Sequence, residues 1–433
     1  MNNKTLLFCL PAILGAPLFG AHASGKETPE DDGEKTGRPN VLFLLTDDQT
    51  FNTIRALGNT EIHTPNMDRL VRRGVAFTQT HVMGGLNGAV SQPSRAMLLT
   101  GRGLMDVHRN GGFIPQAEKT FPEVFRENGY TTFATGKWHS DNASFNRSFS
   151  TGANIFFGGM HPYGRNNELG HRRPYLHQYD PAGDYNDRNG AWADASPETF
   201  SSKLYADAAI GFLEAETSSG DPFLMYVAFT SPHDPRNVLP GYGRKYASAE
   251  LSMPANFVPQ HPFDNGDLNE RDEKLLPTPR VPEQVLAERA NYYGMVSEVD
   301  FQIGRILDAL EKSGKAANTI IVFTSDNGLC VGEHGLLGKQ NLYEAAVRIP
   351  MVICGPGIPQ NTVRDAYCYL YDLYPTLCGL AGIGVPATVK GISLEETRKA
   401  GLEAGGAGEF LTPASRGKSE NGEPGQNGSP FPF

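Results

Sequence analysis

Short apolar runs rich in Val, Ile, Leu and Phe recur along this chain, and each is followed by polar residues suited to binding a metal or an anion. Four runs have this form: residues 41–45, 131–135, 223–229 and 320–323. Continuous apolar runs of this length predict strands buried on both faces, as in a parallel sheet covered by helices. Because ligands bind beyond the carboxyl ends of such strands, the polar ends predict one shared site.

Amphipathic stretches with apolar residues at helical spacing alternate with these runs. They cover residues 66–73, 120–128, 197–216 and 283–312. This alternation predicts an α/β fold with a doubly wound, mostly parallel sheet flanked by helices. Residues 140–196 and 242–282 are polar, rich in Gly, Asn, Tyr or Pro, and weakly periodic. We expect both to be long loops over the site.

The two ends of the chain differ in composition from the rest. Residues 1–23 combine an early Lys, an apolar stretch and Ala21-His22-Ala23, which predicts a secretory signal peptide. Residues 24–38 are predicted to be a flexible leader, 39–394 the α/β domain, and 395–433 a low-complexity, disordered tail. Since no later segment is apolar for long enough to cross a bilayer, we expect an exported protein, periplasmic or secreted.

Charge and cysteine content narrow the possible partners. The formal net charge of −10 argues against nucleic acid, although local cations or a bound metal still allow an anionic substrate. Of the five cysteines, Cys9 lies in the predicted signal peptide, and the other four come late in the chain without paired zinc spacing. One disulfide among those four is possible, and its partners stay open.

Carboxylate and amide side chains follow two of the predicted strands. They are Asp47-Asp48 after the first run and Asp326-Asn327 after the last. Side-chain oxygens on tight turns are the ligands that a hard cation such as Ca²⁺ or Mg²⁺ prefers. The structural alternative is that these residues end a strand and cap the next turn.

The segment Ser91-Gln92-Pro93-Ser94-Arg95 predicts the start of a helix, because Pro suits the first helical turn. Free N–H groups at a helix N-terminus favour an anion near Ser91, and Arg95 lies one turn along the same face. By itself, such a segment is most often only a capped helix start.

This segment, continued by Thr100-Gly101-Arg102, resembles the Cys/Ser-x-Pro-x-Arg motif of the sulfatase family, in the alkaline phosphatase-like superfamily. The resemblance implies that Ser91 is oxidised to formylglycine by a dedicated serine-type maturase. It also implies that a divalent cation, usually Ca²⁺ with Mg²⁺ as the other option, is bound by the following residues: Asp47, Asp48, Ser91, Asp326 and Asn327.

Further family blocks occur in the same order. Residues 135–139, Thr-Gly-Lys-Trp-His, match the block that supplies a sulfate-binding Lys137 and a His139 that contacts the formylglycine hydroxyl. The Ser-Pro-His-Asp-Pro block places His233 at the leaving oxygen, and Lys339 matches a second sulfate-binding lysine. The resemblance therefore implies a catalytic set of Ser91, Arg95, Lys137, His139, His233 and Lys339.

The predicted function is that of an exported sulfatase. Export and the Tyr- and Trp-containing segment 140–196 favour a sulfated carbohydrate as the substrate. Two alternatives stay open: a phosphoesterase or phosphoryl transferase of the same superfamily, and a catalytically inactive protein that binds sulfated glycans. Residues 395–433 hold too few strand-forming residues to build the family's small C-terminal antiparallel-sheet domain, which we therefore expect to be truncated. The oligomeric state stays open.

Overall fold

The computed structural model describes residues 37–395, except residues 87, 89, 111, 162–169, 187, 195, 217–219 and 244. The predicted signal peptide, nearly all of the leader and the tail after residue 395 lie outside the described residues, so these predictions stay predictions. Within the described part of the chain, no helix is both long and apolar enough to cross a membrane.

One mixed sheet of ten strands forms the centre of the fold, in the order β10-β2-β9-β8-β1-β7-β3-β4-β5-β6. The neighbours from β8 to β4 pair in parallel, whereas β9 runs antiparallel to both β2 and β8. The strands are β1 Asn40–Thr46, β2 Gly74–His81, β3 Thr131–Lys137, β4 Thr151–Phe156, β5 Tyr175–His177, β6 Gly190–Trp192, β7 Phe223–Ala228, β8 Thr319–Ser325, β9 Arg348–Cys354 and β10 Thr362–Tyr369.

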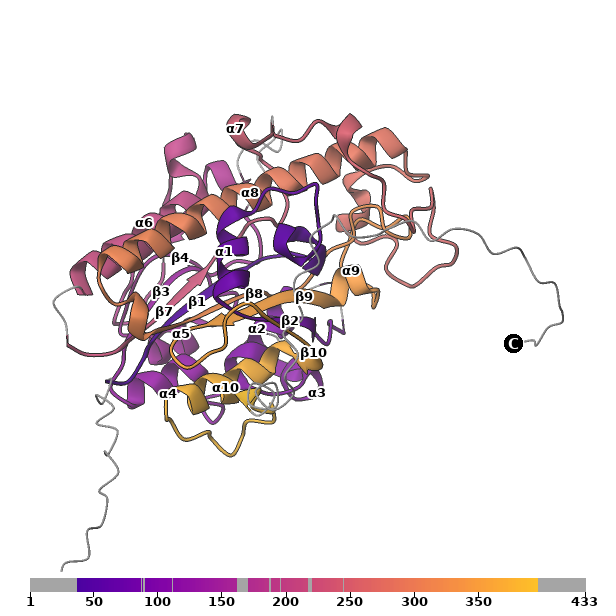
Figure 1. Ribbon diagram of the computed structural model, residues 1–433. Helices are drawn as coiled ribbons and strands as arrows, with labels where there is room; N and C mark the ends of the chain where they lie inside the picture. The colour runs from indigo at the N-terminus through magenta and orange to yellow at the C-terminus, as the bar shows by residue number, and fades with distance from the viewer. Residues whose placement is uncertain are drawn as a thin grey trace, which may run out of the picture. The chain divides into compact units, whose positions relative to one another are not determined.

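Helices cover both faces of the sheet and enclose two apolar cores (Figure 1). Alternate residues of β1 serve different cores: Val41 and Phe43 pack on one side, and Leu42 and Leu44 on the other. One layer consists of α1 Pro65–Arg73, α6 Ser201–Glu216 and α8 Pro282–Lys312. The other contains α2 Ser91–Thr100, α3 Leu104–Val107, α4 Phe121–Glu127, α5 Asn142–Ser148 and α10 Leu373–Leu380. Two short helices, α7 Pro240–Gly243 and α9 Glu344–Val347, lie in connecting segments.

The expected α/β architecture is confirmed, and each of the four predicted strands lies within one residue or so of β1, β3, β7 or β8. The sheet is more mixed than a doubly wound pattern, because β9 enters it in the opposite direction. The prediction of a long loop over residues 140–196 was wrong in part, because α5, β4, β5 and β6 lie in this segment. Strand β4 lies in that segment and pairs with β3, so sheet pairing overrides its weak periodicity.

The late cysteines do not form a disulfide. Cys330, Cys354, Cys368 and Cys378 are all buried as free thiols. Burial raises the pKa of the Cys368 thiol to about 11 and that of Cys378 to about 12, so both are neutral side chains at ordinary pH. Cys354, Cys368 and Cys378 therefore belong to the two apolar cores, and Cys330 packs in a small separate cluster with Leu336 and Ala346.

Candidate active site

The carboxylates after β1 and β8 come together because these strands are neighbours in register. Thr46 of β1 lies opposite Ser325 of β8, so the residues that follow each strand leave the sheet at the same edge. The Asp48 N–H donates to Asp326 Oδ1 at 3.2 Å, and Asn327 Nδ2 donates to Asp48 Oδ1 at 2.6 Å. Asp47, Asp48, Asp326 and Asn327 are all buried, as a metal site at this edge requires.

Ser91 is the first residue of α2 and is buried against this cluster. Its Oγ donates to Asn327 Oδ1 at 2.9 Å and lies 3.3 Å from Asp47 Oδ1. Gly101 ends the helix in the left-handed conformation, with φ of 65°, and its N–H donates to the Met97 carbonyl. The predicted helix start is therefore confirmed, and it holds Ser91 at the carboxyl edge of the sheet.

Two lysines bring positive charge to the same cluster. Lys137 ends β3, and its Nζ donates to Asp47 Oδ2 at 2.5 Å. Lys339 Nζ donates to both carboxylate oxygens of Asp48, at 2.6 and 2.8 Å, and lies 3.5 Å from Ser91 Oγ. Both side chains are buried, so each lysine is available to an anion only where it faces the cavity beside Ser91.

Arg95 lies deeper than the two lysines. Its Nε donates to Asp326 Oδ2 at 2.8 Å, and its Nη1 donates to the Lys137 carbonyl at 2.7 Å. Its Nη2 forms no hydrogen bond within the described part of the chain and lies 3.8 Å from Asp47 Oδ2. Arg95 therefore braces Asp326 and the end of β3 from behind the site.

Buried carboxylates here have opposite pKa shifts. Burial alone would raise the pKa of Asp48, but the charges of His233 and Lys339 outweigh burial and lower it. For Asp326, burial and the negative charge of Asp47 together raise the pKa to about 6. Crowded negative charge at Asp47 and Asp326 is what a bound cation would relieve.

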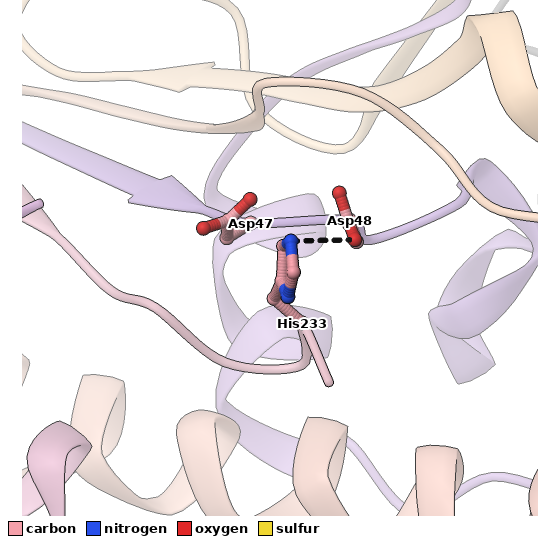
Figure 2. Close-up of side chains that lie close together, drawn as sticks. All are labelled: Asp47, Asp48 and His233. Atoms are coloured by element: carbon pink, nitrogen blue, oxygen red, sulfur yellow. Dashed lines mark ion pairs between the residues drawn. The ribbon is translucent and has the colours of Figure 1, made fainter. Parts of the chain in front are cut away.

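His233 follows β7 and faces the same carboxylates. Figure 2 shows its ring between Asp47 and Asp48, with Nε2 directed to Asp48 Oδ2 at 3.6 Å. The other ring nitrogen, Nδ1, lies 2.7 Å from the Asp234 carbonyl and 3.1 Å from Asp234 Oδ1. Since a carbonyl only accepts, Nδ1 carries the hydrogen and Nε2 is left for chemistry.

His139 comes two residues after Lys137 and has a backbone φ of 60°. Its Nδ1 is buried and forms no hydrogen bond with any residue that the structure describes. Burial, followed by the charges of Lys137 and Arg95, lowers the pKa of this imidazole well below its ordinary value. A neutral imidazole of this kind is suited to accepting a proton.

A cavity of about 200 Å³ brings these groups together. It is lined by Ser91, Lys137, His139, His233 and Lys339, which are the predicted catalytic residues other than Arg95. The predicted set therefore converges from four distant segments.

Sequence reasoning missed several residues at this cavity. Arg271 and Asp272 line it, and they come from the segment predicted to be a loop over the site. Arg271 forms a two-point contact with the Asp234 carboxylate, with Nη2 3.0 Å from Oδ1. Asp234 stood within the Ser-Pro-His-Asp-Pro block, and its position next to His233 was the one signal available. By contrast, Tyr179 and Tyr185 of the 140–196 segment pack on the core.

The donors present fit a divalent cation. Asp47, Asp48 and His233 each offer one ligand atom within 4.8 Å of the others, and all three are buried. The oxygens of Asp326 and Asn327 adjoin the same atoms, and a hard cation prefers such oxygens to the imidazole nitrogen. We therefore favour the carboxylate and amide oxygens over His233 as the ligand set.

Comparison with known proteins identifies the family. The family model described as Sulfatase matches residues 39–383. The N-acetylglucosamine-6-O-sulfatase of Bacteroides thetaiotaomicron is 30% identical over an alignment of 455 residues, gaps included. The alignment covers 89% of this chain and 75% of that protein. The ulvan-active sulfatase of Formosa agariphila is 28% identical and covers 86% of this chain and 67% of its own length.

Solved structures agree with this result. A protein solved in complex with its substrate D-glucosamine-2-N,6-O-disulfate has a TM-score of 0.66 and 25% identity, covering 87% of this chain and 82% of its own. The phosphonate monoester hydrolase of Agrobacterium radiobacter has the same TM-score at 24% identity, covering 84% and 77%, and shares the fold. This chain therefore belongs to the sulfatase family and is a hydrolase of sulfate esters.

Proposed function

We propose that this protein is an exported sulfatase that removes sulfate from carbohydrates, using a formylglycine made from Ser91 and a bound divalent cation, Ca²⁺ or alternatively Mg²⁺. One observation carries the proposal. Ser91 Oγ lies 2.9 Å from Asn327 and 3.3 Å from Asp47 at a cavity that two lysines and two histidines also line. A plain serine without an adjacent base is a poor nucleophile, which favours the modified residue.

Asp47, Asp48, Asp326 and Asn327, together with residue 91, are proposed to hold the cation. When bound, it supplies positive charge to the sulfate oxygens and to the attacking hydroxyl. Formylglycine would supply a hydrated aldehyde with two hydroxyls. One would attack sulfur and give its proton to Asp47, whose Oδ1 lies 3.3 Å from Ser91 Oγ, and the other would expel sulfate afterwards.

Lys137 and Lys339 are proposed to hold the sulfate oxygens, because both line the cavity beside Ser91. In this assignment each lysine leaves part of its present contact with Asp47 or Asp48 and turns to the substrate. Arg95 acts as a positioning residue, since its hydrogen bonds go to Asp326 and the Lys137 carbonyl.

The two histidines are proposed to move protons on opposite sides of the reaction. His233, protonated at both ring nitrogens once sulfate is bound, donates the Nε2 proton to the ester oxygen as the bond from sulfur to that oxygen breaks. Burial lowers the pKa of His233, and the negative charge of a bound sulfate opposes this effect. His139 then accepts the proton of the second hydroxyl as sulfate leaves, and water restores the hydrated aldehyde.

The sugar substrate is proposed from chemistry and from relatives. An N-acetylglucosamine-6-O-sulfatase and an ulvan-active sulfatase are among the curated relatives, and a structural neighbour was solved with a disulfated glucosamine. Export through residues 1–23 and modification by a serine-type maturase complete the proposal.

The first experiment is the mass of the tryptic peptide Gly74 to Arg95, from protein purified from its native source. Loss of two hydrogens at Ser91 is expected, because oxidation of the hydroxymethyl group gives the aldehyde. An unmodified Ser91 in active protein would overturn the proposed nucleophile.

The phosphoesterase alternative is tested by paired rates. Hydrolysis of 4-nitrophenyl sulfate is expected to exceed that of 4-nitrophenyl phosphate by the same enzyme, and the reverse order would favour the alternative. Sulfated glycan binding without sulfate release would favour a binding protein.

A further inference from the structure

A second cavity of about 620 Å³ adjoins the reaction cavity. The two share Val90, Lys339 and Gln340 in their linings. Its size is typical of pockets for small molecules, roughly 300–1,000 Å³. A leaving group that extends from a sulfate beside Ser91 past Lys339 and Gln340 would enter this second cavity, which we name the leaving-group pocket.

Exposed apolar side chains line the leaving-group pocket: Leu86, Phe263 and Leu342. Such side chains provide a surface for the C–H face of a pyranose ring. Phe263 is held in place from behind. The His261 ring packs against it with centroids 4.4 Å apart, and His261 Nε2 lies 3.1 Å from the Tyr343 hydroxyl. A ring stacked on Phe263 therefore meets a supported aromatic surface.

The charges of this pocket differ from those of the reaction cavity. Among the lining residues that the structure describes, the titratable side chains with acidic or basic groups other than the Tyr343 phenol are those of Asp267, Lys339 and His261. Both ring nitrogens of His261 are engaged, Nδ1 with the Phe263 carbonyl and Nε2 with the Tyr343 hydroxyl. Lys339 is bonded to Asp48, whereas no hydrogen bond or ion pair from a described residue reaches the Asp267 carboxylate. The remaining polar groups are the neutral amides of Asn265, Gln340 and Asn341. A second anionic group on the sugar would thus meet a carboxylate and no available cation.

We infer that the leaving-group pocket binds the pyranose ring that carries the reacting sulfate, stacked on Phe263, and that Asp267 selects against rings with a second anionic group. This inference rests on the proposed function. It narrows the substrate class to sugars that carry one sulfate and are otherwise neutral.

The selectivity test compares two sugars with the same ring and the same 6-sulfate. N-acetylglucosamine 6-sulfate has a neutral acetamide where glucosamine-2-N,6-O-disulfate has a second sulfate. Each competes against 4-nitrophenyl sulfate, and the inhibition constants are measured at low salt. We expect the neutral acetamide sugar to bind about tenfold more tightly, and Asp267→Asn to reduce that ratio to about threefold or less.

The stacking test uses a matched pair of exposed phenylalanines. Phe263 is 58% exposed in the pocket, and Phe301, which does not line it, is 51% exposed on α8. Phe263→Ala is expected to raise both inhibition constants about tenfold, and Phe301→Ala to leave them unchanged. Inhibition by inorganic sulfate should stay the same in every variant, since it reports the reaction cavity alone.

Equal binding of the two sugars, an unchanged ratio in Asp267→Asn, or equal effects of the two phenylalanine variants would overturn the inference. If the wild-type protein releases sulfate from neither 4-nitrophenyl sulfate nor N-acetylglucosamine 6-sulfate, the proposed function fails instead. Calorimetric affinities for the same two sugars then decide the pocket independently of turnover.

Discussion

The two adjoining cavities use their side chains in different ways. In the reaction cavity the charged groups are buried and paired, with Lys137 on Asp47 and Lys339 on Asp48. In the leaving-group pocket the apolar side chains are exposed, and no cationic side chain among the residues that the structure describes pairs with Asp267. In the reaction cavity the charged side chains are held in place before substrate binds, whereas the leaving-group pocket offers an exposed apolar surface to the substrate. The difference teaches that chemistry and sugar recognition are separable in this protein.

The physical reason is that reorienting charged side chains during the reaction costs free energy. Groups that stabilise charge in a transition state work best when already oriented in a site that excludes water. Recognition of a sugar ring needs area and a few polar contacts, which exposed loops supply at little cost to stability. Variants in the reaction cavity should therefore change kcat, and variants in the leaving-group pocket should change KM.

The largest effect is expected for Ser91→Ala. Loss of the residue that is modified should lower kcat by about 10⁴-fold or more, since the remaining groups cannot replace a nucleophile. The measurement is sulfate release, alongside the melting temperature, which should stay close to wild type. Ser313→Ala, at the end of α8, is the control. Substantial turnover by Ser91→Ala would break the assignment of the reaction cavity.

Removal of the divalent cation should come next. Dialysis against a chelator is expected to lower activity about 10³-fold, because Lys137 and Lys339 then stay paired with Asp47 and Asp48 and do not turn to the sulfate. Added Ca²⁺ should restore activity, and at a hundredfold excess over its Kd it should raise the free energy of unfolding by about 3 kcal/mol, which is seen as a higher melting temperature. Full activity in the chelated protein would argue against the proposed cation.

His139→Ala should slow the second half of the reaction. Without this base, we expect kcat to fall about 10²–10³-fold and the sulfated form of residue 91 to accumulate. Intact mass after a short incubation with substrate measures it, as an increase of one SO₃ group. His63 is exposed and lines neither cavity, so His63→Ala is the control. Steady turnover without accumulation would refute the role of His139.

Asp234→Asn tests the contact that orients His233. The variant weakens the link from Arg271 through Asp234 to His233 Nδ1. We expect kcat to fall about 10–100-fold for sugar sulfates, whose alkoxide leaving group needs a proton. The fall should be smaller for 4-nitrophenyl sulfate, whose leaving group needs none. Asp264→Asn, on an exposed loop, is the control. An equal loss on both substrates would indicate a structural defect only.

The smallest effect concerns a buried carboxylate outside both cavities. Glu298 on α8 has no adjacent lysine like that of Asp48, and burial raises its pKa to about 7. A pKa raised on folding means that stability is lost as pH rises from about 4.5 to 7. Glu298→Gln should therefore be more stable than wild type by roughly 1–3 kcal/mol at pH 8, and equal near pH 4. Denaturant unfolding measures this, with exposed Glu283→Gln as a control; a constant difference across pH would contradict it.

Much of the sheet and the candidate site was predictable from local pattern. The runs that became β1, β3, β7 and β8 are apolar throughout, which is how strands buried on both faces differ from loops. The segment around Ser91 carried its own helix-start signal in Pro93. Such signals depend on residues a few positions apart, so they are present in the chain before it folds.

Other features depend on segments that meet only when the chain is folded. Strand β9 is as apolar as β8, and its opposite direction follows from its pairing with both β2 and β8. Arg271 reaches Asp234 across 37 residues, and Phe263 borders a pocket whose other walls include residues 84–86, 90 and 339–343. The spacing of residues along the chain encodes the apolar period of each strand or helix, the residues that begin and end helices, and the side chains available for chemistry. The tautomer of His233, the bracing by Arg95 and the shape of the leaving-group pocket depend on distances between remote segments, and those are set by packing across the sheet.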